Sequence, residues 1–149
     1  MAEGNLLHVE DDEGMRPFVA AAMLHAGYAV EAVSNGVDAI KTLHSAPRAF
    51  DLVVLDLVLP WINGLDVLAA IRSGAPTRAL PVLVTTGTFI TANQFNGDRL
   101  VSVLRKPFDD QQLIAGKRDS PCGAVRRQRA GSRLDGTPEG RASGRPIRI

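Results

Sequence analysis

Carboxylates stand at the ends of two apolar runs in this sequence. Glu10 and Asp11 follow residues 5–9, and Asp56 follows residues 52–55. An unpaired charge is costly inside a strand that is buried on both faces, so we expect each acid to lie where its strand leaves the core. A solvated turn residue is the simpler interpretation of one such acid alone. Side chains elsewhere in the chain favour a site instead.

A hydroxyl and an ammonium group stand at the ends of two later apolar runs. Thr86 follows residues 81–85, and Lys106 comes soon after residues 100–104. Converging carboxylates either bind a cation or acquire raised pKa values, and Mg²⁺ is the usual partner of carboxylates and phosphate. A carboxylate nucleophile, a cation, a hydroxyl and a lysine can together hold a phosphoryl group during its transfer. Asp56 would be the nucleophile and would form an aspartyl-phosphate.

The elements that must position these groups alternate between strands and helices. Each expected strand is short and apolar, and each is followed by a segment with helical spacing of apolar residues. This alternation predicts an α/β fold: a doubly wound, flavodoxin-like sheet of five parallel strands in the order 2-1-3-4-5, with helices on both faces. The switch point between the first and third strands brings Glu10 and Asp11 beside Asp56. The expected strands are residues 5–9, 28–33, 52–55, 81–85 and 100–104.

The expected helices carry recognisable start and stop signals. Asp12 can cap the first helix, and Gly27 can end it. We expect further helices at residues 37–44 and 65–73, a weak one at 88–96, and a last one that begins at Asp109 and loses its pattern at Gly116.

Charge divides the chain into two parts. Residues 1–116 hold 8 Lys/Arg and 13 Asp/Glu, a net charge of −5, whereas residues 117–149 hold 9 and 3, a net charge of +6. We therefore predict one domain over residues 4–116 and a basic, disordered tail over 117–149, which is rich in Gly, Ser and Pro. The tail is either a solvated extension or a basic arm for nucleic acid or an acidic partner. No helix-turn-helix pattern is present, so no DNA-binding output domain is expected.

Composition indicates a protein of the cytoplasm. No apolar run approaches the roughly 20 residues that a membrane helix requires. No secretory signal is visible at the amino terminus, and the single cysteine, Cys122, fits a reducing compartment. We expect no membrane association.

The ordered set of motifs resembles the receiver domain of two-component response regulators, the chemotaxis-regulator-like fold. The set consists of Glu10-Asp11, Asp56 with Pro60 and Gly64, Thr86-Gly87 and Lys106-Pro107. The resemblance covers about residues 4 to 115, and every signature motif stands in its expected order and element. It also implies a Lys106-Pro107 bond of a kind that is often cis in the family.

The resemblance implies roles for individual residues. Asp56 would accept the phosphoryl group, Asp56 and Asp11 would bind Mg²⁺, and Val58 would contribute its backbone carbonyl. Glu10 would act on the metal largely through water. Thr86 and Lys106 would bind the phosphoryl oxygens. Phosphate would come from a sensor histidine kinase or a histidine phosphotransfer protein.

Two positions qualify this resemblance. Thr85 competes with Thr86 for the hydroxyl role, because alternation along a strand lets only one of them face Asp56, and the spacing from Pro81 favours Thr86. Val103 stands where the family usually has Tyr or Phe, whose rotation reports phosphorylation. The phosphoacceptor site therefore looks complete, while the aromatic relay looks absent.

Two other residues have simpler interpretations. His8 lies inside the first strand, where we expect a buried structural histidine. Trp61 is expected in an exposed loop near Asp56, where it is either a partner contact or a plain surface aromatic, and it could report metal binding by fluorescence.

The sequence thus predicts a single-domain response regulator that is phosphorylated on Asp56 and signals by a conformational shift and protein contact. It would not be an enzyme beyond self-phosphorylation from donors and autodephosphorylation, and it could form a phosphorylation-dependent dimer. The alternative is a pseudo-receiver or phosphate-sink module without an output switch. A small phosphatase would want a second acid two residues after Asp56, where Val58 stands.

Overall fold

Five parallel strands form the centre of the computed structural model, which describes residues 4–88, 92–95 and 97–119. The strands are β1 (Gly4–Val9), β2 (Tyr28–Val33), β3 (Leu52–Asp56), β4 (Val82–Thr86) and β5 (Val101–Arg105). Their order is β2-β1-β3-β4-β5, which confirms the predicted α/β topology.

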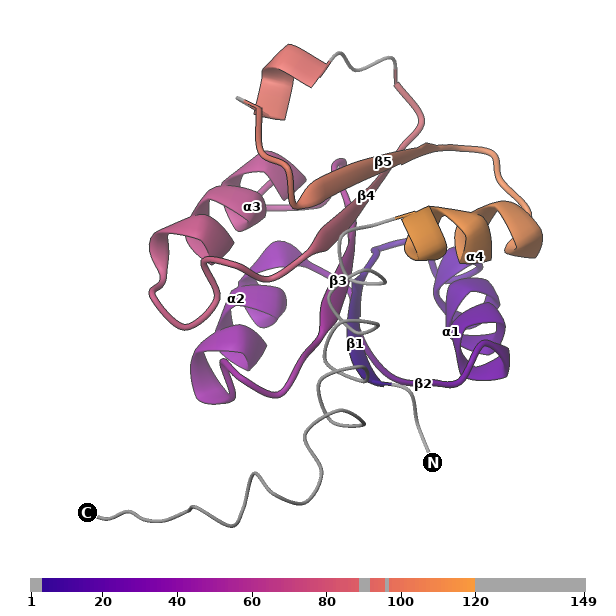
Figure 1. Ribbon diagram of the computed structural model, residues 1–149, viewed down its shortest axis with the longest axis horizontal. Coiled ribbons are helices and arrows are strands. Elements are labelled where there is room, and N and C mark those ends of the chain that lie inside the picture. The colour runs from indigo at the N-terminus through magenta and orange to yellow at the C-terminus, as the bar shows by residue number, and fades with distance from the viewer. Residues whose placement is uncertain (1–3, 89–91, 96, 120–149) are drawn as a thin grey trace, which may run out of the picture.

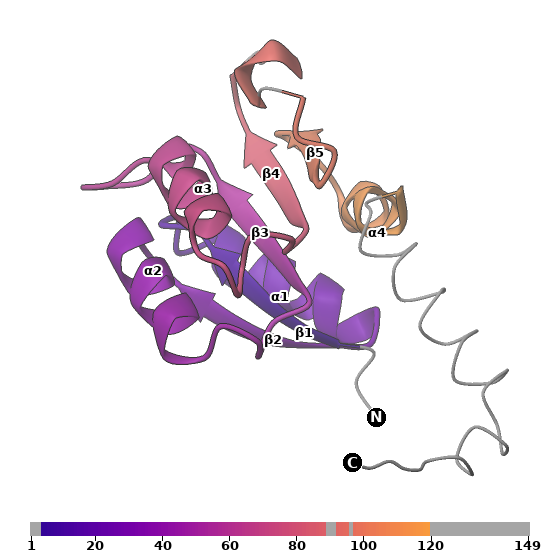
Figure 2. The ribbon, with the colours of Figure 1, turned by 60° about the vertical axis from the view of Figure 1, so that its left-hand side comes forward.

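Helices cover both faces of the sheet (Figures 1 and 2). One face carries α2 (Gly36–Ser45) and α3 (Gly64–Ser73), and the other carries α1 (Met15–His25) and α4 (Asp110–Asp119). Two apolar clusters result, because successive side chains of each buried strand point to opposite faces. Leu6, Leu52 and Leu83 pack on the α1 side, whereas Val53 and Val84 pack on the α2 side.

The starts of α2, α3 and α4 follow from polar capping residues. Asn35 Oδ1 accepts a hydrogen bond of 2.8 Å from the Asp38 amide, and Asn63 Oδ1 accepts one of 2.9 Å from the Asp66 amide. Asp109 and Gln112 cap the start of α4 reciprocally, each side chain accepting from the other's amide. Each cap fixes where the chain turns from a strand end into a helix.

Several predicted boundaries shift by a residue or more. β4 and β5 each begin and end one residue later than predicted, so Thr86 is the last residue of β4 rather than the first of a loop. Its carbonyl accepts the Lys106 amide at 2.7 Å, which extends the pairing with β5. Helix α4 continues through Gly116 to Asp119.

The helix predicted at residues 88–96 is wrong in its described part. A 3-10 helix, η1 (Ala92–Phe95), stands there, and residues 89–91 and 96 lie outside the described residues. Phe95 is buried against the α3 side of the sheet. The segment is poor in helix formers, so one apolar anchor rather than an amphipathic face holds it.

His8 is a buried strand residue, as predicted. It is 1% exposed, lies opposite Val54 of β3, and shares the α1 side of β1 with Leu6. Burial, with smaller effects of the Lys106 and Arg16 charges, lowers its pKa to about 4, so the ring is neutral near pH 7. Neither ring nitrogen has a hydrogen-bond partner among the described residues.

No helix in the described part of the chain is long and apolar enough to cross a membrane. The predicted tail over residues 117–149 lies outside the described residues from position 120 onward.

Candidate functional site

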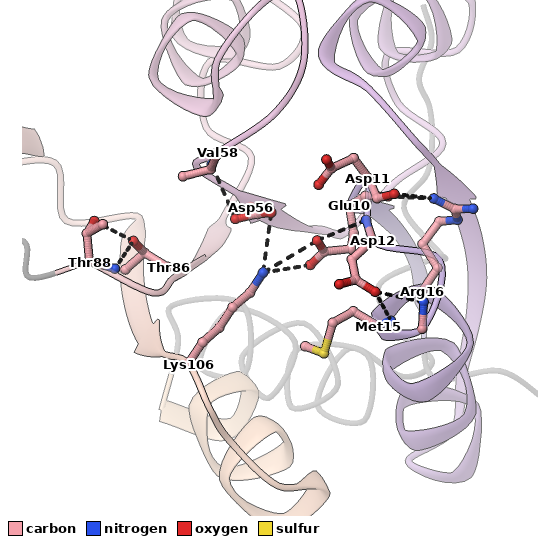
Figure 3. Close-up of polar contacts among 11 residues, drawn as sticks. Glu10, Asp11, Asp12, Met15, Arg16, Asp56, Val58, Thr86, Thr88 and Lys106 are labelled. Atoms are coloured by element: carbon pink, nitrogen blue, oxygen red, sulfur yellow. Dashed lines mark hydrogen bonds and ion pairs between the residues drawn. The ribbon is translucent and has the colours of Figure 1, made fainter.

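The carboxyl ends of β1 and β3 lie side by side and bring three acids together. Val9 pairs with Leu55 in the register of the sheet, so the next residues, Glu10 and Asp56, are neighbours. One carboxylate oxygen from each of Glu10, Asp11 and Asp56 lies within 4.8 Å of the others. Glu10 and Asp56 are buried, whereas Asp11 is exposed at the mouth of the cluster (Figure 3).

Lys106 reaches this cluster from the end of β5. Its Nζ donates to Glu10 Oε1 at 3.1 Å and lies 3.3 Å from Asp56 Oδ2 (Figure 3). The ammonium therefore bridges the two buried carboxylates. The Lys106–Pro107 peptide bond is cis, in agreement with the family pattern.

The acids repel one another despite this lysine. Burial raises the pKa of Glu10 to about 7, and its hydrogen bond with Asp56 and the Asp56 charge add to that effect, while Lys106 opposes it. Burial by itself would lower the pKa of the Lys106 ammonium, but its carboxylate neighbours outweigh burial and raise it. The cluster holds more negative charge than one lysine balances, so it favours a further cation.

A tight loop leaves β3 directly after Asp56. The Val58 amide donates to Asp56 Oδ1 at 3.3 Å, and the Gly64 amide donates to the Leu57 carbonyl at 2.8 Å. A Cβ atom on Gly64 would lie 2.5 Å from the Asp56 carbonyl oxygen, so only glycine allows the loop to close here. Closure holds the Val58 backbone beside the Asp56 carboxylate, where the sequence predicts a carbonyl ligand.

Thr86 stands at the rim of the cluster, at the end of β4. Its hydroxyl lies 3.0 Å from the Thr88 hydroxyl and accepts the Thr88 amide at 3.1 Å (Figure 3). Thr85 pairs with Asp56 in the strand register, and its buried hydroxyl has no partner in the part of the chain that the structure describes. Neither threonine is hydrogen-bonded to Asp56 among the described residues, so the choice of Thr86 stays a prediction.

Arg16 supports the acid cluster and was not singled out from the sequence. Its Nη1 donates to the carbonyls of Glu10 at 3.0 Å and Asp11 at 3.1 Å. Asp12 Oδ1 accepts the Gly14 and Met15 amides, and these bonds lower the pKa of the Asp12 carboxyl. The predicted capping position is wrong by two residues, because α1 begins at Met15 and its N-cap is Gly14. The sequence feature that could have identified Arg16 is its place one turn after a run of acids, from which its side chain can reach the preceding carbonyls.

The residues present fit a hard divalent cation. Mg²⁺ prefers carboxylate and carbonyl oxygens and keeps several waters, and the cluster offers two buried acids with one exposed acid at its mouth. Asp11, Asp56 and the Val58 carbonyl could hold the ion directly, with Glu10 acting through water. When bound, the ion would neutralise negative charge on a phosphoryl group. Lys106 supplies a second positive charge at the same carboxylate.

Comparison with known proteins gives one consistent family. The family described as "Response regulator receiver domain" matches residues 6–116. The response regulator ArlR of Staphylococcus epidermidis is 32% identical over 113 residues, which cover 74% of this chain and 49% of ArlR. The chain thus spans about half the length of this curated relative.

Solved structures share the fold. The chemotaxis protein CheY4 of Vibrio cholerae superposes with a TM-score of 0.70 at 25% identity, covering 80% of this chain and 98% of that one. The receiver domain of the sensor histidine kinase PA1611 of Pseudomonas aeruginosa, whose structure has a magnesium ion in its active-site cleft, superposes at 0.68 with 24% identity, covering 80% and 98%.

Proposed function

Because the chain belongs to the response regulator receiver domain family of two-component systems, whose members act as phosphoacceptors, we propose that it accepts a phosphoryl group on Asp56 in a Mg²⁺-dependent reaction. The observation that carries the proposal is the position of Lys106 Nζ, 3.3 Å from Asp56 Oδ2 and 3.1 Å from Glu10 Oε1. It places a fixed positive charge at the carboxylate that would react.

The proposed chemistry is an in-line transfer. An Asp56 oxygen attacks phosphorus, the bond from phosphorus to the donor breaks, and the bonding electron pair leaves with the donor atom. Asp11, Asp56 and the Val58 carbonyl are the proposed metal ligands, with Glu10 acting through water. Lys106 and Thr86 are the proposed contacts of the phosphoryl oxygens, and Thr86 would exchange its bond with Thr88 for one with phosphate.

The donor, the output and the location belong to the same proposal. The donor would be a sensor histidine kinase or a histidine phosphotransfer protein, and the chain would act in the cytoplasm as a single-domain regulator with a receiver over residues 4–116 and a basic tail over 117–149. Its signal would pass through contact with a protein partner or a phosphorylation-dependent dimer, by a shift between two existing conformations.

Phosphorylation is tested by incubating the chain with acetyl phosphate and Mg²⁺ and measuring its intact mass. We expect a gain of one phosphoryl group that hydroxylamine removes and that Asp56→Asn abolishes. Asp51→Asn, which changes a half-buried carboxylate outside the three-acid cluster, should retain the gain. A gain that survives in Asp56→Asn would move the phosphoacceptor elsewhere, and no gain in the unaltered chain would contradict the proposal.

A phosphate-sink or pseudo-receiver function is the second candidate. Val103 favours it, since this residue of β5 is 46% exposed and carries no aromatic ring that could move inward on phosphorylation. Hydrogen exchange separates the two candidates. A receiver with an output switch should change amide protection in β5 when Asp56 is phosphorylated, whereas a phosphate sink should change it only around Asp56.

A further inference from the structure

Trp61 has an unusual conformation for a large apolar residue. It is 81% exposed, and its φ of 68° lies in the left-handed region that L-residues rarely adopt. The Ile62 amide donates to the Pro60 carbonyl at 2.8 Å, which closes a three-residue turn around Trp61. Packing in the core does not explain the presence of a tryptophan whose ring faces solvent. Strained backbone conformations such as this one tend to persist at functional positions.

The loop that carries Trp61 is fixed to the backbone of Asp56. Gly64 closes the loop onto Leu57 and packs against the Asp56 carbonyl. Trp61 is three residues from Gly64, and three residues span at most about 11 Å. Leu59 is buried on one side of Trp61, and Ile62 packs against the core on the other. The backbone of Trp61 is therefore held at a defined place near the phosphoacceptor.

The mouth of the site is acidic on one side and apolar on the other. On the side of β1, Asp11, Asp12 and Glu13 are exposed acids. On the side of β3, the large hydrophobic side chains that the loop exposes are Val58, at 64%, and Trp61. A planar cationic ring suits both sides, because it is attracted by the carboxylates and binds well against the face of an indole.

We propose that Trp61 recognises the phosphodonor by stacking on the imidazole ring of a phosphohistidine. This inference rests on the proposed function of Asp56. When the second nitrogen of a phosphorylated imidazole is protonated, the planar ring carries a positive charge, while the phosphoryl group remains anionic. When the Asp56 oxygen bonds to phosphorus, the phosphorus–nitrogen bond breaks, its electron pair stays on nitrogen, and the proton stays on the other nitrogen. The ring leaves neutral, so its attraction to the indole and the acids weakens after transfer.

The test compares two small donors that differ in their leaving group. Phosphoimidazole carries the aromatic ring, and phosphoramidate does not. With Mg²⁺ present, Trp61→Ala should lower kcat/KM for phosphoimidazole five- to tenfold, mainly through KM, and change the value for phosphoramidate less than twofold. Trp61→Phe should retain most of the phosphoimidazole rate. Leu24→Ala is the matched control, because Leu24 is 58% exposed but lies in the last turn of α1, and it should change neither donor.

The outcomes separate the inference from the function on which it rests. An equal loss with both donors, or no loss with either, overturns the role of Trp61 while Asp56 remains the phosphoacceptor. Failure of both donors to phosphorylate the unaltered chain overturns the proposed function and this inference together. Circular dichroism of each variant confirms that a lost rate does not come from lost folding.

Discussion

At the scale of single residues, Glu10 makes metal binding depend on pH. Its pKa is raised to about 7 by burial and by Asp56, whereas a carboxylate must be ionised to assist a metal ion. Below about pH 7 a proton competes with the ion. We expect Mg²⁺ affinity to fall about tenfold between pH 8 and pH 6, measured by calorimetry or by quenching of Trp61 fluorescence.

Two variants test the assignment of this proton to Glu10. Glu10→Gln should bind Mg²⁺ more weakly and lose most of the pH dependence between pH 6 and pH 8. Glu13→Gln is the control, because Glu13 is an exposed acid of the same run outside the three-carboxylate cluster. A pH dependence that persists in Glu10→Gln would assign the proton to another group.

His8 makes stability depend on pH in a separate way. Its ring is buried with two unpartnered nitrogens among the described residues, and an unpaired buried polar atom costs about 1–3 kcal/mol. His8→Leu should therefore raise the free energy of unfolding at pH 7 by about 1 kcal/mol. Urea denaturation measures this change. A loss of stability instead would mean that the ring makes bonds that leucine cannot replace.

The advantage of His8→Leu should grow in acid. The folded-state pKa of His8 is lowered to about 4 from 6.5, so below pH 6.5 the unfolded chain takes up a proton that the folded chain refuses. The unaltered protein loses stability as pH falls through this window, and the leucine variant does not. At pH 5 the difference between them should widen by about 2 kcal/mol. A difference that stays constant from pH 7 to pH 5 would contradict the lowered pKa.

At the scale of elements, Arg72 ties α3 to the chain before β4 and β5. Its Nε donates to Asp98 Oδ2 at 2.5 Å, and its Nη1 donates to the Leu80 carbonyl at 2.6 Å. Asp98 also accepts the Leu100 amide at 2.9 Å, one residue before β5 begins. Asp98 therefore joins the end of α3 to the start of β5.

Removing this connection should destabilise the β5 edge of the sheet. We expect Asp98→Ala to lower the free energy of unfolding by about 1–2 kcal/mol, because a charge-assisted bond to a partly buried arginine is lost. Arg99→Ala changes an exposed neighbour and should have little effect. Hydrogen exchange should show the Asp98→Ala loss mainly in β5, and a uniform loss over all strands would argue against a local connection.

Strand patterns in the sequence were sufficient to predict the architecture. The apolar run of β3 and the alternation of strands with helices predict the order of the sheet. Crossover connections between parallel strands are almost always right-handed, so few strand orders are possible. The predicted strand boundaries were less accurate, because pairing between β4 and β5 sets where these strands end. No local signal in the sequence marks those ends. The segment before β5 could not be predicted, because one tertiary contact of Phe95 outweighs weak local propensity.

The clustering of the three acids could be predicted, but the contacts around them could not. The strand order alone brings Glu10, Asp11 and Asp56 together. The bridging position of Lys106 depends on the path of a long side chain across the end of β4, and the bonds of Arg16 depend on the angle at which α1 leaves the cluster. Neither angle nor path is visible in a pattern of residue types.

At the scale of the whole molecule, charge separates the site from the carboxyl-terminal segment. Residues 1–116 carry a net charge of −5 and contain every proposed site residue, whereas residues 117–149 carry +6. Opposite charges attract over about 10 Å at ~0.1 M salt and over shorter distances at higher salt. If residues 117–149 form a separate tail, as predicted, their removal should leave Mg²⁺ binding unchanged.

Truncation tests this separation, and the structure shows where to cut. Helix α4 continues to Asp119, and Leu113 within it is fully buried, so truncation after Asp119 preserves the helix and truncation after Gly116 removes its last three residues. We expect the chain ending at Asp119 to keep the Mg²⁺ affinity of the full chain within twofold at 0.15 M salt, measured by Trp61 fluorescence. The chain ending at Gly116 should bind equally well but unfold at a lower urea concentration. If truncation after Asp119 instead strengthens Mg²⁺ binding and added salt abolishes the gain, the basic segment competes with the ion for the acid cluster and is not a separate part of the molecule.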